Sequence, residues 1–177
     1  MIWRRRLPVL ENEFLTLRPL QHDDAKFLFD YAGDPAVTQF LPWEPHPQIE
    51  TVESFVAEQI RKNRRGESVA LAIVWRESGR VIGSIDLRIL AAGEAEIGYV
   101  LARAWWGRGI MTQAVALVTR YGLNEKKLAR VIAWADAENH ASRRVLEKNN
   151  FKLCGAETRC VRNNQRPYVR YEIGQIQ

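Results

Sequence analysis

The sequence predicts one α/β (α+β) domain over residues 1–177, with a mixed, mostly antiparallel sheet of six to seven strands and helices on both faces. Residues 69–101 contain three apolar, strand-like runs separated by short turns at 77–80 and 91–93, which indicates an antiparallel meander. Residues 95–135 then read strand, helix and strand, a spacing that predicts a parallel crossover. The 177 residues, 46% of them hydrophobic, suffice for one core.

The N-terminal elements follow from alternation and capping residues. Residues 14–20 alternate as a strand closed by Pro19, which is typical of a strand end. Asp23 or Asp24 is expected to cap a helix over residues 25–31. The Asp34-Pro35 pair is expected to start another short helical turn, because proline is tolerated at the first helical position.

A proline-rich loop and a long helix come next. Residues 41–47 hold three prolines around Trp43, so Trp43 either walls a binding site or packs on the core. Thr51 is expected to cap a helix that ends at the basic run Arg61–Arg65, followed by Gly66.

The C-terminal part predicts one helix and two closing strands. Asn139 is expected to cap a helix over residues 141–149, followed by strands at 151–155 and 168–173 joined by a polar loop around 162–165. Cys154 and Cys160 lie six residues apart in one apparent strand, about 20 Å, which is too far for a disulfide. Free thiols in a reducing compartment are therefore expected, and neither cysteine suggests zinc or another metal.

Charge and hydropathy bound the class of protein. The formal net charge of +5 favours anionic ligands. No apolar run approaches the ~20 residues of a membrane span, and the basic start lacks the apolar stretch of a signal peptide. A soluble, cytoplasmic protein with no membrane partner is expected.

The most informative stretch is the turn Gly107-Arg108-Gly109, between the strand that ends at Leu101 and a helix with apolar spacing. Such a turn leaves backbone N–H groups unpaired at the positive end of a helix dipole, an arrangement that binds a diphosphate. The match to the nucleoside-triphosphate loop is weak because its lysine is missing. The dinucleotide fingerprint is weak because Thr112 occupies the third glycine position.

The order of elements resembles the GNAT superfamily of acetyl-CoA-dependent N-acetyltransferases, closest to the branch with the ribosomal-protein N-terminal acetyltransferases. The resemblance covers nearly the whole chain and rests on five segments: residues 15–20, 82–85, 95–101, 106–112 and 139–151. It implies a GNAT-type fold, acetyl-CoA as co-substrate, and an amine acceptor that is a protein N-terminus or a small molecule.

Three positions depart from the family pattern. Ala104 stands where glutamine or arginine is usual, so the diphosphate is expected to be held by backbone amides. Leu146 stands where a tyrosine often protonates the leaving thiolate. Asn150 replaces the usual glycine, and asparagine tolerates the left-handed turn expected there.

The coenzyme site is expected along the strand end and the glycine turn. The pantetheine arm would pair with Tyr99–Leu101 in strand fashion, and the resemblance implies that the N–H of Val100 or Leu101 polarises the thioester carbonyl. Asn139 would bond the arm or act only as a helix cap. The expected coenzyme ligands are Tyr99, Val100, Leu101, Trp106, Gly107, Arg108, Gly109, Ile110, Met111, Thr112, Asn139 and Arg143.

Glu96 is the candidate general base, on the same strand face as Glu94 and Gly98, although an exposed strand carboxylate would look the same. Trp43 and Glu96 are the candidate acceptor ligands. No acid is named; Ser142 or solvent would protonate the sulfur. The candidate cations for the 3′-phosphate are Arg103, Arg108, Arg143 and Lys148, and Trp105 and Trp106 are expected to pack on the core and the coenzyme.

Two other functions remain possible. A non-catalytic acyl-CoA-binding regulator would use the same cleft, and Leu146 in the tyrosine position keeps that alternative open. Nucleic-acid binding is disfavoured because the run Arg61–Arg65 is typical of a solvated helix end. A homodimer is possible.

Overall fold

The structure is a computed structural model that describes residues 7–90 and 93–174, so part of the predicted turn at 91–93 lies outside the described residues. One sheet of eight strands runs through the molecule in the order β1-β2-β3-β4-β5-β6-β8-β7. Among the strands of the described residues, only the β5–β6 pair is parallel. The predicted fold class and crossover are confirmed, with one strand more than expected, the two-residue β1 that pairs with β2.

The elements have the following bounds. The strands are β1 Leu10–Glu11, β2 Leu15–Pro19, β3 Ser68–Trp75, β4 Arg80–Ile89, β5 Glu94–Leu101, β6 Arg130–Asp136, β7 Lys152–Val161 and β8 Asn164–Gly174. The α-helices are α1 Ala25–Ala32, α2 Pro35–Thr38, α3 Ile49–Arg65, α4 Ile110–Arg120 and α5 His140–Lys148. Short helical turns are η1 His22–Asp24, η2 Arg103–Trp105 and the π-turn η3 Tyr121–Glu125.

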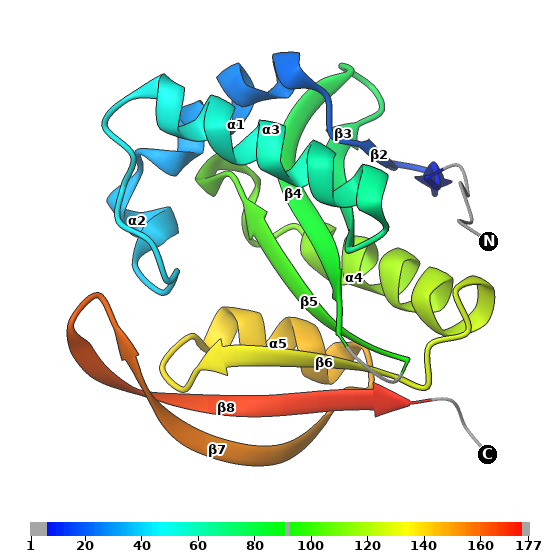
Figure 1. Cartoon of the computed structure of the whole chain (residues 1–177), viewed down its shortest axis with the longest axis vertical. Helices are drawn as coiled ribbons and strands as arrows, with labels where there is room; N and C mark the ends of the chain where they lie inside the picture. Colours follow the sequence, from blue (N-terminus) through cyan, green and yellow to red (C-terminus); the bar gives the residue numbers. More distant parts are fainter. Residues whose placement is uncertain (1–6, 91–92, 175–177) are drawn as a thin grey trace.

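The sheet is covered on both faces, which explains the continuous apolar run of β3. Val69, Leu71 and Ile73 belong to the core formed with α4 and α5. Ala70 and Ala72 alternate with them and face α1 and α3, which cover the other side (Figure 1). A strand buried on both faces needs apolar side chains at every position.

The β5–β6 pair opens after three residue pairs. The parallel register joins Glu94 to Arg130, Ala95 to Val131 and Glu96 to Ile132. Both strands continue, to Leu101 and Asp136, without pairing further with each other. The C-terminal half of β5 therefore has an edge with no strand beside it, in the middle of the sheet.

Several predicted caps are confirmed. The Asp34 carboxylate accepts the Ala36 N–H at 2.9 Å, and Asn139 Oδ1 accepts the Ser142 N–H at 3.1 Å. Gly66 ends α3 with φ +74°, and Asn150 adopts φ +63° in place of a glycine.

One predicted cap is wrong, and a second, Asp24, holds the predicted N-cap position without the side-chain bond. Helix α3 begins at Ile49 after Gln48, so Thr51 lies inside its first turn. Asp24 makes no capping hydrogen bond to α1; its carboxylate instead binds the Arg18 guanidinium at 2.7 Å and accepts the Gln21 N–H at 2.8 Å. An arginine partner on β2 outcompetes the helix for that carboxylate.

The two predicted closing strands are present, and the polar loop between them lies where it was predicted but is shorter than residues 162–165. Residues 162 and 163 form a tight turn with φ +51° and +60°, and β7 and β8 run as a long hairpin on either side of it. Strand β7 is exposed along almost its whole length, so the polar side chains of its second half gave no apolar signal that the strand continues. Cys154 and Cys160 both lie on β7 as free, exposed thiols.

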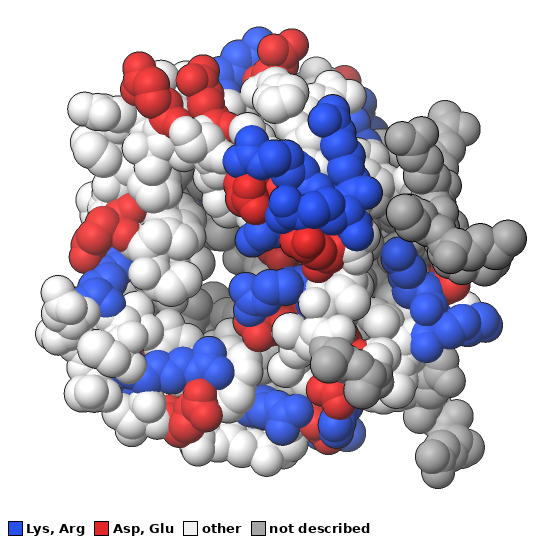
Figure 2. All heavy atoms as spheres, in the orientation of Figure 1, with Lys and Arg blue, Asp and Glu red and all other residues white. Residues whose placement is uncertain are grey.

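The basic end of α3 is paired with acids. Arg61 binds Glu58 at 2.8 Å, and Arg65 binds both Glu58 and Glu67. Figure 2 shows Lys and Arg side chains intermixed with acidic ones on this face, beside the hollow between the two halves of the molecule. Within residues 7–90 and 93–174, no helix is long and apolar enough to cross a membrane.

Candidate active site

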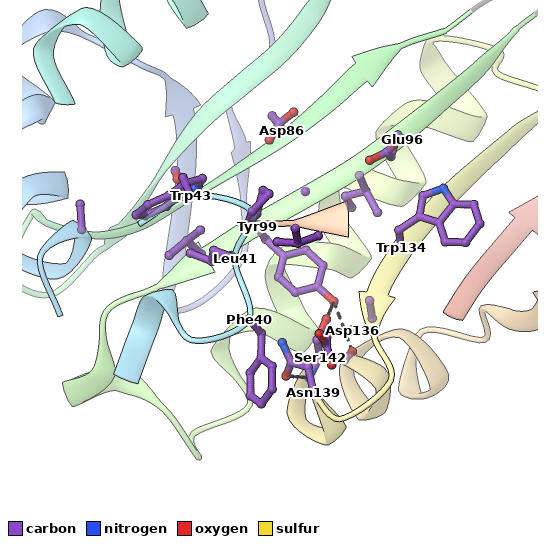
Figure 3. Close-up of a pocket in the computed structure, with 18 of the residues that line it drawn as sticks. Phe40, Leu41, Trp43, Asp86, Glu96, Tyr99, Trp134, Asp136, Asn139 and Ser142 are labelled. Carbon is purple, nitrogen blue, oxygen red and sulfur yellow. Dashed lines mark hydrogen bonds between the residues drawn. The ribbon is translucent and has the colours of Figure 1, made fainter. Parts of the chain in front are cut away.

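A cavity of about 890 Å³ lies where β5 and β6 separate. Its floor is formed by β4 and β5, one wall by β6 and the start of α5, and the opposite wall by α1, α3 and the loop before α3 (Figure 3). It therefore joins the free edge of β5 to the proline-rich loop. Of the predicted site residues, it brings together Trp43, Glu96, Tyr99, Val100 and Asn139.

The glycine turn lies beyond the end of β5 and has the geometry of an anion site. Gly107 and Gly109 adopt φ +74° and +69°, a conformation that favours glycine. Among the described residues, no N–H from 107 to 112 donates to a backbone carbonyl outside the regular elements, and the first such bond, from Gln113 to Gly109, is 3.2 Å. These free N–H groups, at the N-terminus of α4, fit a diphosphate held by backbone alone.

The two tryptophans of this segment behave differently. Trp105 packs on the core, with its ring centroid 5.1 Å from that of Trp75 and the Arg108 guanidinium 5.1 Å away. Trp106 does not pack on the core as predicted; its side chain is exposed, and its indole N–H donates to the Leu101 carbonyl at 2.8 Å. Trp106 therefore fixes the chain direction as β5 ends.

A hydroxyl pair joins β5 to α5 on the cavity wall. The Tyr99 hydroxyl lies 2.9 Å from Ser142 Oγ and 3.3 Å from the Ser142 carbonyl (Figure 3). Burial raises the pKa of Tyr99 above its usual value, so this phenol stays protonated at neutral pH. Asn139 holds the first turn of α5 beside it.

Two predicted positions serve the packing of α5. The Arg143 guanidinium donates to the Tyr171 hydroxyl at 3.2 Å and to the Ala137 carbonyl at 3.0 Å, which ties α5 to β8. Leu146 is fully buried in the core shared with α4. Because leucine has no hydroxyl, a proton donor to the leaving thiolate would have to come from another position.

The predicted base Glu96 is half-buried and paired. Its carboxylate lies 2.6 Å from the Arg88 guanidinium across the β4–β5 register. Glu94 is likewise paired, with Arg130. Each carboxylate thus already has a guanidinium partner within the sheet.

Asp86, which sequence reasoning missed, is a further carboxylate of the cavity, in addition to Glu96 and the buried Asp136. It stands opposite Gly98 in the register, and a Cβ on Gly98 would lie 3.1 Å from Asp86 Oδ1. Burial raises the pKa of Asp86 to about 6, and Glu96 adds to the rise, while Arg88 and Lys62 oppose it. The alternation of Ser84, Asp86 and Arg88 along β4 was a signal that could have placed Asp86 on the face of Glu96.

Residues 15–152 match the family of acetyltransferase (GNAT) domains. The chain belongs to this family. As a GNAT protein it is an acetyl-CoA-dependent N-acetyltransferase, as the sequence predicted. Within the part of the chain that the structure describes, no three His, Cys, Asp or Glu residues are grouped to hold a metal ion.

The GNAT domain is similar to several curated proteins. It is 34% identical over 163 residues to the probable N-acetyltransferase YjcK of Bacillus subtilis, covering 88% of this chain and 90% of that one. It is 30% identical over 151 residues to the uncharacterized N-acetyltransferase p20 of Bacillus licheniformis, covering 84% and 85%. The solved structure of RimL, a ribosomal L7/L12 alpha-N-protein acetyltransferase in complex with coenzyme A, superposes with a TM-score of 0.84 and 22% identity, covering 95% of this chain and 97% of that one. At that identity the likeness concerns the fold.

Proposed function

We propose that this GNAT enzyme transfers the acetyl group of acetyl-CoA to a primary amine by direct attack in a ternary complex. The observation that carries the proposal is one continuous cavity in which the unpaired edge of β5 meets two carboxylates, Asp86 and Glu96. Acetyl-CoA supplies an acetyl thioester as the electrophile. The acceptor is a protein N-terminus or a small amine.

The chain offers separate groups for each part of the coenzyme. The N–H groups of residues 107–112 would hold the diphosphate, with Trp106, Arg108 and the first turn of α4 around it. The arm would add alongside Tyr99–Leu101, where β5 has no neighbour, and Asn139 would meet it from α5. The N–H of Val100 would polarise the thioester carbonyl.

Arg143 is a weaker candidate for the 3′-phosphate than the sequence suggested, because its guanidinium already donates to Tyr171 and Ala137. Arg108 is the central residue of the glycine turn, and its guanidinium stacks on the Trp105 ring. This stacking leaves the N–H groups of the guanidinium edge available to a phosphate. Of the two, we favour Arg108 for this role.

The base role is best supported for Asp86, with Glu96 as its charged neighbour. A base works best when its pKa is close to the operating pH, and the pKa of Asp86 is about 6. Glu96 is held by Arg88 and raises the pKa of Asp86 through its charge. We therefore propose that Asp86 accepts the proton of the amine and that Glu96 tunes it and helps to attract the cationic acceptor.

The leaving sulfur also needs a proton. As the amine nitrogen bonds to the acetyl carbon and the carbon–sulfur bond breaks, the amine proton passes to a carboxylate and the sulfur gains a proton. The Tyr99 and Ser142 hydroxyls are hydrogen-bonded to each other on the cavity wall and lie beside the proposed arm. They are placed to take the role that Leu146 cannot perform.

The deciding experiment combines acetyl-CoA titration calorimetry with release of free thiol over a panel of primary amines. We expect the wild type to bind and to turn over at least one amine. Asp86→Asn should reduce kcat/KM at least a hundredfold, and Glu96→Gln about tenfold, with acetyl-CoA affinity unchanged in both. If Glu96→Gln is the more damaging change, the base is Glu96 as the sequence predicted. Absence of acetyl-CoA binding would refute the whole proposal.

The non-catalytic regulator is not favoured, because binding an acyl-CoA gives no reason for a carboxylate with a raised pKa at the end of the cavity. Binding without turnover of any amine would restore it. Association into a homodimer stays a prediction.

A further inference from the structure

Two arginines of the β7–β8 hairpin, Arg162 and Arg166, bind the segment of residues 38–44 that includes the start of the proline-rich loop. We call these contacts the arginine clamp. The Arg162 guanidinium donates to the backbone carbonyls of Thr38, Leu41 and Trp43, at 2.9 Å for Leu41, and lies 3.4 Å from the Glu44 carboxylate. Its side chain is only 19% exposed. One side chain thus holds three carbonyls of a segment more than a hundred residues away in the sequence.

Arg166 adds a second attachment beside the first. It donates to the Gln39 carbonyl at 3.0 Å, and its guanidinium lies 5.4 Å from the Phe40 ring centroid. Its Nε lies 2.7 Å from the carboxylate of Asp136, whose side chain is fully buried at the end of β6. Because Asp136 lies at the end of β6, this contact connects the loop to the strand that borders the cavity.

The backbone of Arg162 indicates that this clamp is built into the hairpin. Arg162 has φ +51°, a conformation that non-glycine residues adopt at a cost of about 1 kcal/mol. Glycine or asparagine would form the same two-residue turn more easily. The contacts of the Arg162 side chain offset this backbone cost.

The clamped loop supplies one wall of the acceptor end of the cavity. Phe40, Leu41 and Trp43 line it from the loop, and Trp43 stacks on His46 with ring centroids 4.7 Å apart. Trp134 and Tyr168 line it from β6 and β8. The proposed base Asp86 lies on the floor between these aromatic walls (Figure 3).

The far wall carries a guanidinium, that of Arg159, which is paired with Glu157 on the same strand. Arg159 lies over the Trp134 ring, 3.8 Å from its centroid, and lines the cavity. It already occupies the aromatic face on which a substrate cation would stack. The carboxylate of Asp136 also lines this wall, but it is buried and paired with Arg166. A second ammonium of an acceptor would therefore meet the Arg159 guanidinium and apolar side chains, whereas the first would meet Asp86 and Glu96.

We propose that Arg162 and Arg166 are specificity-determining positioning residues. They hold the loop so that the cavity accepts a single primary amine carried on an apolar or aromatic group, with the amine toward Asp86. The inference rests on the proposed function and narrows its acceptor to one chemistry. That chemistry could be supplied by a small molecule or by a chain N-terminus with an apolar first residue.

The substrate half of the test compares matched amines with the wild-type enzyme. Hexylamine and 1,6-diaminohexane have the same length and differ by one far ammonium. We expect kcat/KM to be at least tenfold higher for hexylamine, and phenethylamine to exceed both. A tripeptide that begins with phenylalanine, compared with phenethylamine, tells the two sources apart. Equal or better use of the diamine would overturn the inference.

The clamp half of the test uses Arg162→Gly, because glycine adopts φ +51° without strain and removes only the side-chain contacts. Asn163→Gly is the matched control, since residue 163 has φ +60° in the same turn. Arg162→Gly should raise the KM for hexylamine at least tenfold and erase its advantage over the diamine, with kcat changed less and acetyl-CoA affinity within twofold. Asn163→Gly should behave as wild type.

The outcomes separate the two proposals. If the wild type acetylates no amine, the proposed function fails. If it acetylates amines and Arg162→Gly leaves both KM and the hexylamine preference unchanged, the proposed function stands and the clamp inference is refuted. Circular dichroism of both glycine variants checks that the hairpin folds.

Discussion

Asp86 gives the active site a titration that can be measured directly. Its pKa of about 6 means that the proposed base loses its proton as the pH rises through 6. The charged groups that face it are Glu96 on β5, Arg88 on β4 and Lys62 on α3. We expect kcat/KM at low substrate to rise tenfold per pH unit below about 6, on top of the titration of the amine itself.

The control for this profile is a comparison of acceptors and variants. A limb set by the acceptor amine shifts when the acceptor pKa changes, whereas the limb of Asp86 stays near 6. Asp86→Asn should lose that limb and leave only the amine titration. A wild-type profile without any transition near pH 6 would contradict the assignment.

Asp86 should also lower the stability of the folded protein at pH values where its carboxyl group is ionised. Folding raises the pKa of Asp86 from 3.8 to about 6, so its charged form is less favourable in the folded protein. A raised pKa gives stability that is complete below pH 3.8 and is lost as the pH rises through 6. Asp86→Asn should therefore gain on the order of 2 kcal/mol relative to wild type between pH 4 and pH 8.

Urea unfolding of both proteins at the two pH values measures this difference. Asp23→Asn serves as the control, because Asp23 is an exposed carboxylate on another part of the molecule. If the relative stability of Asp86→Asn does not change between the two pH values, Asp86 is not desolvated in the folded state.

At the scale of elements, Gly83 on β4 controls where Val100 lies. A Cβ built on Gly83 would overlap the Val100 carbonyl and lie 3.2 Å from Leu101 Cα. These are backbone atoms of β5, so a methyl group has to displace the strand edge that would carry the arm. Gly83→Ala should lower kcat at least tenfold through the misplaced Val100 N–H, by analogy with loss of one oxyanion donor.

Thiol-release kinetics and acetyl-CoA calorimetry together check this expectation. Gly79→Ala is a useful comparison, since a Cβ there meets nothing within 4 Å and any effect is limited to its turn conformation. Normal kcat in Gly83→Ala would show that Val100 does not need its present position.

The elements also show how far the sequence could lead. The meander, the crossover and the glycine turn were predictable because apolar alternation and glycine placement are local signals. The two closing strands were also predicted, but not their full length, since the second half of β7 is exposed and polar and its strand character depends on pairing with β8. Glu96 was visible as a carboxylate on the strand that leads to the glycine turn, whereas Asp86 acquires its raised pKa from burial between distant elements and, to a smaller extent, from Glu96.

The two arginines show the same limit more clearly. Arg162 and Arg166 looked like part of a polar loop, because their partners are carbonyls of residues 38–43, which no side-chain pattern encodes. Contacts between a side chain and backbone carbonyls more than a hundred residues away in the sequence can be seen only in the folded structure.

At the scale of the whole molecule, the proposed coenzyme would bridge the opening between the two halves. The halves meet in the sheet through three residue pairs of β5 and β6, and outside the sheet through the core that α4 shares with α5 and through the arginine clamp. A ligand that binds only the folded state at a hundred times its Kd adds about 2.7 kcal/mol of stability. For a chain of this size we expect acetyl-CoA at that excess to raise Tm by about 5–10 °C.

Differential scanning fluorimetry over a range of acetyl-CoA concentrations measures the shift. Asp86→Asn should show the full increase, because Asp86 is assigned to the acceptor end of the cavity. Gly109→Ala should show a smaller increase at the same concentration, since an alanine at φ +69° strains the turn that presents the free N–H groups. An unchanged Tm in the wild type at millimolar acetyl-CoA would mean that the opening between β5 and β6 does not hold the coenzyme.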